Sequence, residues 1–139
     1  MNLRMKWKSY PEKVYHCDII EMNDGNEGDR IGECELVLLP SNKRCFELND
    51  QLIKTHYNTK TIYFNEFWLI ESKRNQGIGS FILKNVLLQI KKKNTNYEKL
   101  ILICKHTLSH FYERLGFSKL GVSEYMNHDV FYIMGINLK

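Results

Sequence analysis

The alternation of hydrophobic and polar positions predicts β-structure over the first third of the chain. Leu3 to Lys8 alternates apolar with basic residues, a pattern typical of an edge strand. Val14 to Met22 and Ile31 to Leu39 favour two further strands. The polar, glycine-containing stretch Asn23 to Asp29 between them predicts a hairpin turn.

The middle of the chain alternates strand patterns with helix patterns. Thr61 to Ile70 is rich in β-branched and aromatic residues and predicts a central strand. Phe81 to Ile90 has apolar residues at helical spacing, and Leu100 to Cys104 is apolar on both faces, as in a buried strand. Thr107 to Leu115 predicts a second helix, with Thr107 as its N-cap.

The remaining segments complete an α/β pattern. Phe117 to Ser123 and Val130 to Leu138 predict a closing pair of strands, and Cys45 to His56 favours one short helix. A chain of 139 residues is long enough to bury its own core, so we expect one domain over residues 1–139. The predicted fold is a mixed, mostly antiparallel sheet of about seven strands with helices on both faces.

Composition and charge narrow the class of protein. No apolar run approaches the ~20 residues of a membrane helix, and Met1 to Lys8 lacks the apolar region of a secretory signal. The formal charge of +4 would help attract an anionic ligand, but the lysines are scattered and form no basic face with aromatic residues. We therefore expect a cytoplasmic protein that binds neither membranes nor nucleic acid.

The cysteines and histidines show no metal-binding spacing. The cysteines form neither a C-x-x-C pair nor a zinc pattern, and we expect them to be small buried side chains in a reducing cytosol: Cys17, Cys34, Cys45 and Cys104. His106 and His110 are four residues apart on a predicted helix, with no Glu between them and no third ligand in sight. No metal is expected.

A glycine-containing loop links the central strand to the helix after it: Arg74-Asn75-Gln76-Gly77-Ile78-Gly79-Ser80. This order turns the unpaired N–H groups of a helix start toward a ligand, and glycine lets a phosphate approach closely. No Lys-Ser or Lys-Thr pair follows, which excludes a nucleotide P-loop. A dinucleotide fold is disfavoured because Ile82 takes the third glycine position and the next strand runs into Lys105 and His106.

The spacing R-x-x-G-x-G, followed at once by a helix, resembles the acetyl-CoA signature of the GNAT superfamily of N-acetyltransferases. Asn75 stands where glycine is commonest in that family. A second segment, Phe111 to Phe117, is similar to the family's F-Y-E-x-L-G-F motif, in which Gly116 would be left-handed after the helix. Glu66 to Ile70 fits the strand before the loop, so the three motifs cover residues 62–121 in family order.

The resemblance implies an acetyl-CoA-dependent N-acetyltransferase of GNAT fold. Family members place two helices between their first two strands, whereas only Ser9 to Lys13 stands there in this chain. The N-terminal helical pair is therefore predicted to be reduced. Because that pair helps to wall the acceptor pocket in the family, Asn42 to Lys60 is expected to take over part of the wall.

The resemblance also implies how acetyl-CoA is held. The strand before the loop would splay from the next one, with the pantetheine arm between them and a main-chain N–H near Leu69 facing the thioester carbonyl. Loop N–H groups would bind the pyrophosphate, and Arg74 would pair with a phosphate; a place on the helix surface is the alternative for Arg74. The predicted cofactor-binding residues are Leu69, Ile70, Glu71, Arg74, Asn75, Gln76, Gly77, Ile78, Gly79, Ser80 and Lys105.

The predicted catalytic residues are Tyr112 and Glu66. Tyr112 matches the family tyrosine that serves as general acid to the leaving thiolate; a buried core aromatic is the alternative. Glu66 is the predicted base, because neighbouring aromatic residues would desolvate it; a solvent-facing strand carboxylate is the alternative. Glu71 and His106 are further candidates for the base.

The predicted reaction is direct attack of a primary amine on acetyl-CoA in a ternary complex, with a small molecule or peptide as acceptor. The alternative is a catalytically silent domain of the same fold that binds acyl-CoA as a sensor or interaction module. Exposed strands at the sheet edge make a homodimer compatible with the sequence.

Overall fold

A computed structural model describes residues 2–11, 14–38, 60–74, 76–93, 96–123 and 129–139. The predictions for Asn75 and Cys45 and for a short helix over Cys45 to His56 lie outside these residues. The same holds for the predicted pocket wall Asn42 to Lys60, of which only Lys60 is described.

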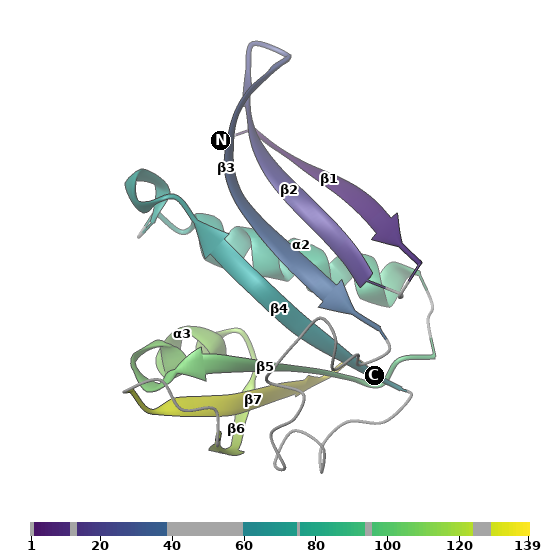
Figure 1. The fold of residues 1–139 in the computed structure, drawn as a ribbon, viewed down its shortest axis with the longest axis vertical. Helices are drawn as coiled ribbons and strands as arrows, with labels where there is room; N and C mark the ends of the chain where they lie inside the picture. Colours follow the sequence, from purple (N-terminus) through teal and green to yellow (C-terminus); the bar gives the residue numbers. More distant parts are fainter. Residues whose placement is uncertain (1, 12–13, 39–59, 75, 94–95, 124–128) are drawn as a thin grey trace.

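Seven strands form one sheet in the order β1-β2-β3-β4-β5-β7-β6 (Figure 1). Every neighbouring pair is antiparallel except β4 and β5, which are parallel. The sheet and the reduced N-terminal helical pair are confirmed, since only residues 11–13 separate the first two strands. The strands are β1 (Leu3–Tyr10), β2 (Val14–Asn23), β3 (Asn26–Val37), β4 (Thr61–Leu69), β5 (Lys99–Lys105), β6 (Ser118–Val122) and β7 (Phe131–Asn137).

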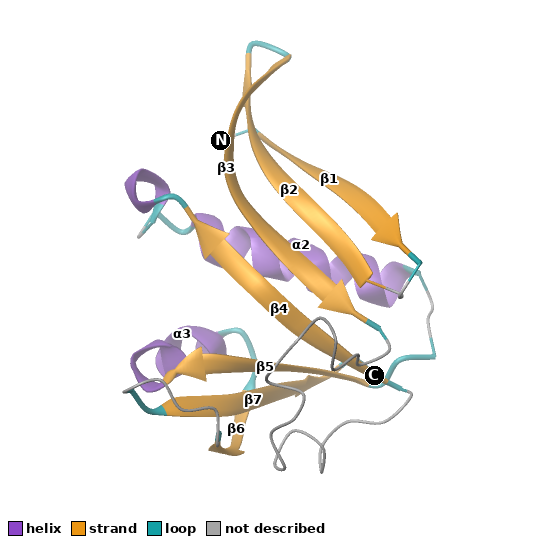
Figure 2. Ribbon diagram, in the orientation of Figure 1, coloured by secondary structure: helices purple, strands orange, loops and turns teal. Residues whose placement is uncertain are grey.

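The helices α2 (Ile78–Lys92) and α3 (Ser109–Arg114) add side chains to the same hydrophobic cluster on one face of the sheet. Helices were predicted on both faces, but both α-helices of the described residues lie on this one. Figure 2 shows α2 crossing behind β2, β3 and β4. From α2, Ile82 and Val86 are fully buried there, and from α3 Tyr112 joins them. Neither helix is long and apolar enough to cross a membrane, and the same is true of the other described helical turns.

The opposite face of the sheet carries a second, smaller cluster. It is built from alternate strand positions that point away from α2: Val14, Val37, Tyr63, Ile101 and Ile133. Because successive strand residues point to opposite faces, the same strands also place Cys17, Cys34 and Cys104 toward the helices. These three thiols are buried, as the sequence predicts.

Two local predictions are wrong. The hairpin turn is shorter than Asn23 to Asp29: Asp24 and Gly25 have φ values of 50° and 81°, and β3 already begins at Asn26. A two-residue turn of this kind matches strand twist, so the polar residues after it can pair as a strand. Thr107 does not cap the second helix, because it lies in a 3₁₀ turn and α3 begins after Leu108 with no side-chain cap.

Candidate functional site

A cleft opens where β4 and β5 separate. The two strands pair only from Thr61 to Tyr63 with Lys99 to Ile101 and then diverge (Figure 1). The gap holds a cavity of about 180 Å³. Its lining comes from both strands, α3 and the start of β7: Tyr63, Phe64, Asn65, Glu66, Phe67, Leu102, Ile103, Tyr112 and Phe131.

A β-bulge interrupts β4 at the cleft. Glu33 pairs with Trp68 and Glu35 pairs with Asn65, so β4 uses three steps where β3 uses two. The backbone of Glu66 is left-handed within this stretch, with φ of 53°. A glutamate in that conformation stores strain of roughly 1–3 kcal/mol, and such bulges recur beside active sites because they re-aim the strand. The bulge therefore makes this part of β4 a candidate functional position.

Beyond the bulge, β4 presents one main-chain N–H to the cleft side. Ile70 donates its N–H to the Ile31 carbonyl on β3 at 2.8 Å. Because neighbouring N–H groups of a strand point to opposite edges, the N–H of Leu69 points away from β3. The Leu69 carbonyl on that same edge accepts a hydrogen bond from Arg74 Nε at 2.9 Å. Arg74 thus ties the loop to the end of β4.

Some of the main-chain groups that were predicted to contact the cofactor already have hydrogen-bond partners within the protein. The Ile70 carbonyl accepts from the Lys73 N–H at 3.0 Å, so both polar main-chain groups of Ile70 are already paired. Glu71 stands in an exposed 3₁₀ turn, Glu71–Lys73, and its carbonyl accepts from the Arg74 N–H at 3.1 Å. Contacts of Ile70 with a cofactor would have to use its side chain, whereas no described backbone group accepts from the Glu71 N–H.

The start of α2 offers unpaired donors. Gly77 is its N-cap with φ of 77°, and the first hydrogen bond inside the helix runs from Phe81 N–H to the Gly77 carbonyl at 3.1 Å. The N–H groups of Ile78, Gly79 and Ser80 therefore have no partner inside the helix. A Cβ at Gly77 would meet no atom within 4 Å, so the backbone there is open to a ligand.

This helix start lies close to both the strand and α3. A Cβ at Gly79 would stand 3.5 Å from the ring of Phe111 and 3.8 Å from the Leu69 side chain. Figure 1 shows the N-terminus of α2 beside the end of β4, beyond the point where β4 diverges from β5. The predicted phosphate loop therefore lies beyond the end of the strand that lines the cavity, and Gln76, Gly77 and Ile78 line a separate pocket there with Leu3 and Phe81.

Tyr112 lies at the inner wall of the cleft. Its side chain packs edge-on against Phe111 and Phe117, with ring centroids 5.0 Å and 5.6 Å away, and the residue is 7% exposed. Burial, with a smaller contribution from Cys104, raises the pKa of Tyr112 well above its ordinary value. The hydroxyl therefore stays protonated at neutral pH and can donate a hydrogen bond or a proton.

The other predicted residues are distributed less favourably. Glu66 lines the cleft but is exposed, so the prediction of a desolvated carboxylate is wrong. His106 is exposed and pairs through Nε2 with Asp129 at 3.4 Å. Lys105 is exposed at the end of β5. Neither of these last two is among the described residues that line the cavity.

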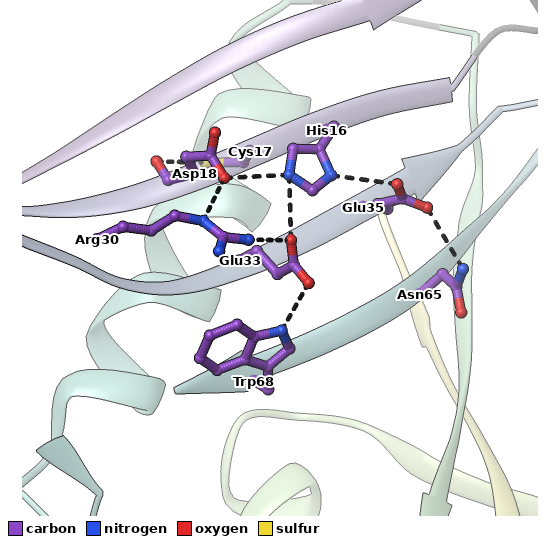
Figure 3. Close-up of polar contacts among 8 residues, drawn as sticks. All are labelled: His16, Cys17, Asp18, Arg30, Glu33, Glu35, Asn65 and Trp68. Atoms are coloured by element: carbon purple, nitrogen blue, oxygen red, sulfur yellow. Dashed lines mark hydrogen bonds and ion pairs between the residues drawn. The ribbon is translucent and has the colours of Figure 1, made fainter. Parts of the chain in front are cut away.

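A polar network on the open face of the sheet was not predicted (Figure 3). His16 and Asp18 of β2 face Glu33 and Glu35 of β3, and Arg30 contacts both Asp18 and Glu33. The signal in the sequence is a pair of polar residues at i and i+2 on each of two neighbouring strands, which places all four side chains on one face. His16, Asp18 and Glu33 have side-chain atoms within 4.8 Å of one another, but Arg30 already binds the oxygens between them.

Comparisons with known proteins agree with this geometry. A family model described as an acetyltransferase (GNAT) domain matches residues 26–119. No curated protein sequence matches the chain.

Solved structures of similar fold share little sequence with this chain. The ribosomal-protein-S18-alanine N-acetyltransferase from Escherichia coli has a TM-score of 0.63 at 12% identity, covering 94% of this chain and 72% of its own. A GNAT acetyltransferase from Staphylococcus aureus has a TM-score of 0.59 at 18% identity, covering 92% and 70%. A CoA-dependent acyl-homoserine lactone synthase, solved with isopentyl-CoA and SAM, has a TM-score of 0.68 at 10% identity, covering 95% and 62%.

Proposed function

The chain belongs to the GNAT acetyltransferase family, and we propose that it transfers an acetyl group from acetyl-CoA to a primary amine by direct attack in a ternary complex. The observation that carries this proposal is the divergence of β4 from β5. It brings the strained bulge at Glu66 and the buried Tyr112 to one cleft, and α2 begins just beyond the end of the same strand. The acceptor is the amine of a small molecule or peptide.

The residues present fit an acyl-CoA molecule. The main-chain N–H of Leu69 lies on the cleft edge of β4, where a pantetheine arm can take the place of a neighbouring strand. The N–H groups of Gly77 to Ser80 and the dipole of α2 suit a pyrophosphate, and the open space at Gly77 leaves room for it. The acyl-CoA ligand of one structural neighbour is consistent with this use of the fold.

The rest of the predicted cofactor set has supporting roles. Arg74 fixes the loop through the Leu69 carbonyl and leaves its terminal nitrogens to pair with a phosphate. Gln76 anchors the same loop by donating from Nε2 to the Ser72 carbonyl at 2.8 Å. Lys105 adds positive charge at the end of β5.

Three groups of this chain act on the reacting atoms. Glu66 takes a proton from the acceptor ammonium, directly or through water, which frees the nitrogen lone pair to form the new C–N bond. The N–H of Leu69 donates to the thioester oxygen as charge develops there, an arrangement that supplies a few kcal/mol, about 3, in enzymes where it is measured. As the C–S bond breaks, Tyr112 donates its proton to the leaving thiolate, and the second proton that the nitrogen loses on becoming an amide returns to Tyr112 through water.

A thermal-shift titration with acetyl-CoA tests the binding part of this proposal, with coenzyme A, NADH and ATP as controls. Ligands that bind only the folded state raise the melting temperature by mass action, so acetyl-CoA and coenzyme A should stabilise the protein and the nucleotides should not. A panel of primary amines, followed by release of free thiol, then tests transfer. Absence of any shift at millimolar acetyl-CoA would overturn the proposal. Binding without turnover on the panel would favour the silent acyl-CoA module.

A further inference from the structure

Two side-chain contacts tie the bulge in β4 to β3 on the open face of the sheet. Asn65, just before the bulge, donates from Nδ2 to Glu35 Oε1 at 3.4 Å. Trp68, just after it, donates from Nε1 to Glu33 Oε1 at 2.6 Å. Figure 3 shows both contacts. The strained residue Glu66 lies between the two anchored residues in the sequence.

One imidazole links the two anchoring carboxylates. His16 Nδ1 lies 3.1 Å from Glu35 Oε2, and His16 Nε2 lies 3.3 Å from Glu33 Oε2 and 3.2 Å from Asp18 Oδ1. Carboxylates only accept hydrogen bonds, so both ring nitrogens can be satisfied only when each carries a proton. The arrangement thus selects the imidazolium form of His16.

The surrounding charges agree with a cationic His16. Facing it are the carboxylates of Asp18, Glu33 and Glu35, and Arg30 neutralises part of that charge by contacting Asp18 and Glu33. On β1, Lys8 is the register partner of His16, and its Nζ lies 5.3 Å from the Tyr10 ring centroid. Burial lowers the pKa of His16, but the hydrogen bonds to Glu35 and Asp18 and the charges of Asp18 and Glu33 outweigh it, so the pKa is raised.

We propose that His16, as an imidazolium, is a positioning residue for acyl transfer. It holds Glu33 and Glu35 where they anchor Trp68 and Asn65 on either side of the bulge. The bulge in turn sets the direction of the β4 main chain along the cleft. We call the contacts that run from His16 through Glu33 and Glu35 to the bulge the His16 clamp. The existence of this clamp follows from the contacts alone, and only its consequence for catalysis rests on the proposed function.

Glu35 makes the clamp sensitive to the charge of His16. The residue is 2% exposed, and the energy of a buried charge depends strongly on its partners. When His16 loses its proton, one ring nitrogen becomes an acceptor facing a carboxylate oxygen. That contact turns repulsive, and the carboxylates that anchor the bulge must shift.

A pH titration of the ¹⁵N-labelled protein by NMR tests the clamp without any acceptor. From about pH 5 to about pH 9, which spans the usual range of histidine, the backbone amides of Glu66 and Phe67 and the indole N–H of Trp68 should titrate with the midpoint of the His16 ring. His110, whose side chain is 82% exposed, gives the reference for a histidine outside the network. If the chemical shifts of these bulge groups do not change as the His16 ring titrates, the inference is wrong.

Two variants connect the clamp to catalysis. His16→Gln should abolish the shared titration and, with an amine acceptor in hand, lower kcat by on the order of 10²-fold, the cost of a small misplacement of reacting groups, with KM for acetyl-CoA nearly unchanged. His16→Arg retains a planar cation and should restore part of kcat at high pH. Equal kcat in His16→Gln and wild type would remove the catalytic part of the proposal.

Calorimetry with acetyl-CoA distinguishes failure of the clamp from failure of the proposed function. If the protein binds acetyl-CoA but the bulge resonances do not titrate with His16, the clamp is wrong and the acetyltransferase proposal stands. If the bulge resonances titrate with His16 but the protein does not bind acetyl-CoA, the clamp stands and the acetyltransferase proposal is wrong. Since the titration uses the wild-type chain, a variant that fails to fold does not remove the test.

Discussion

The main-chain N–H of Phe117 donates a hydrogen bond to the carbonyl oxygen of Tyr112 at 3.1 Å. Gly116 N–H donates to the Glu113 carbonyl at 3.0 Å, which completes a Schellman motif at the end of α3. The motif requires a left-handed residue after the helix, and Gly116 has φ of 101°. The proposed general acid is thus held by the same turn that ends its helix.

Replacing Gly116 with alanine should destabilise the protein by about 1–2 kcal/mol, because a Cβ is strained at this φ. The added Cβ would also stand 3.2 Å from the end of the Ile136 side chain, which must move slightly. Urea unfolding measures the change. Gly79→Ala is the control, because its Cβ would make only ordinary contacts. Equal losses in the two variants would contradict the role assigned to the turn.

Replacing Gly77 with glutamate should abolish acetyl-CoA binding. The added carboxylate would project beside the helix start and repel the pyrophosphate. Because two like charges brought together at a binding site cost several kcal/mol, Kd should rise by about 10²-fold or more. Isothermal calorimetry measures Kd.

Gly25→Glu is the matched control for Gly77→Glu. Gly25 also has positive φ, 81°, and open space around a Cβ, but it lies in the turn between β2 and β3. Both variants should lose similar stability, about 1 kcal/mol, from backbone strain. Retained binding in Gly77→Glu would remove the phosphate-binding assignment of the loop.

Tyr112→Phe should lower kcat by on the order of 10²-fold while leaving the Kd of acetyl-CoA nearly unchanged. The substitution removes the hydroxyl and keeps the ring that packs against Phe111 and Phe117. Stopped-flow or steady-state thiol release measures kcat. Tyr97→Phe is the control, since Tyr97 lines a separate cavity with Trp7 and Tyr15. An undiminished kcat in Tyr112→Phe would mean that Tyr112 is a packing residue only.

The free energy of unfolding should depend on pH through His16. Its pKa in the folded protein is raised above the ordinary value of 6.5, so its contribution is complete below that value and is lost as pH rises through the folded pKa. The stability difference between wild type and His16→Gln should therefore shrink from about pH 6 to about pH 9. A constant difference across this range would contradict the cationic network.

Patterns that repeat along the chain predicted most of the fold. The alternation in Leu3 to Lys8, the apolar run Leu100 to Cys104 and the helical spacing from Phe81 to Ile90 all correspond to observed elements. Each reflects burial of one face or both, which sequence periodicity records directly. The left-handed backbone of Gly116 was also predictable, since the residue after a helix is often left-handed and is then usually glycine.

Features created by the register between strands could not be predicted. The bulge at Glu66 exists because β4 has one more residue than β3 between two paired positions, and no residue type in the sequence indicates it. The charge network around His16 likewise depends on the pairing of His16 with Glu35. The local sequence pattern also predicted the wrong role for Thr107, because a 3₁₀ turn over His106–Leu108 comes before the start of α3.

Three substitutions at Glu66 separate its backbone role from its chemical role. Glu66→Val places a β-branched residue at φ of 53° and should cost about 1–2 kcal/mol of stability. Glu66→Gly suits that φ and should be near neutral, because relief of strain offsets the greater entropy of the unfolded chain. Urea unfolding of the two variants measures the strain that the bulge stores.

Glu66→Gln changes only the carboxylate and should keep the stability of wild type within about 0.5 kcal/mol. If Glu66 is the base, kcat falls by about 10²-fold in both Glu66→Gln and Glu66→Gly, because both lose the same proton acceptor. Thiol release at saturating acetyl-CoA measures this. Full activity in Glu66→Gln together with unfolding losses in Glu66→Val would assign Glu66 to the bulge alone. The amine would then reach the cleft already deprotonated, and its positioning against the thioester would carry the rate.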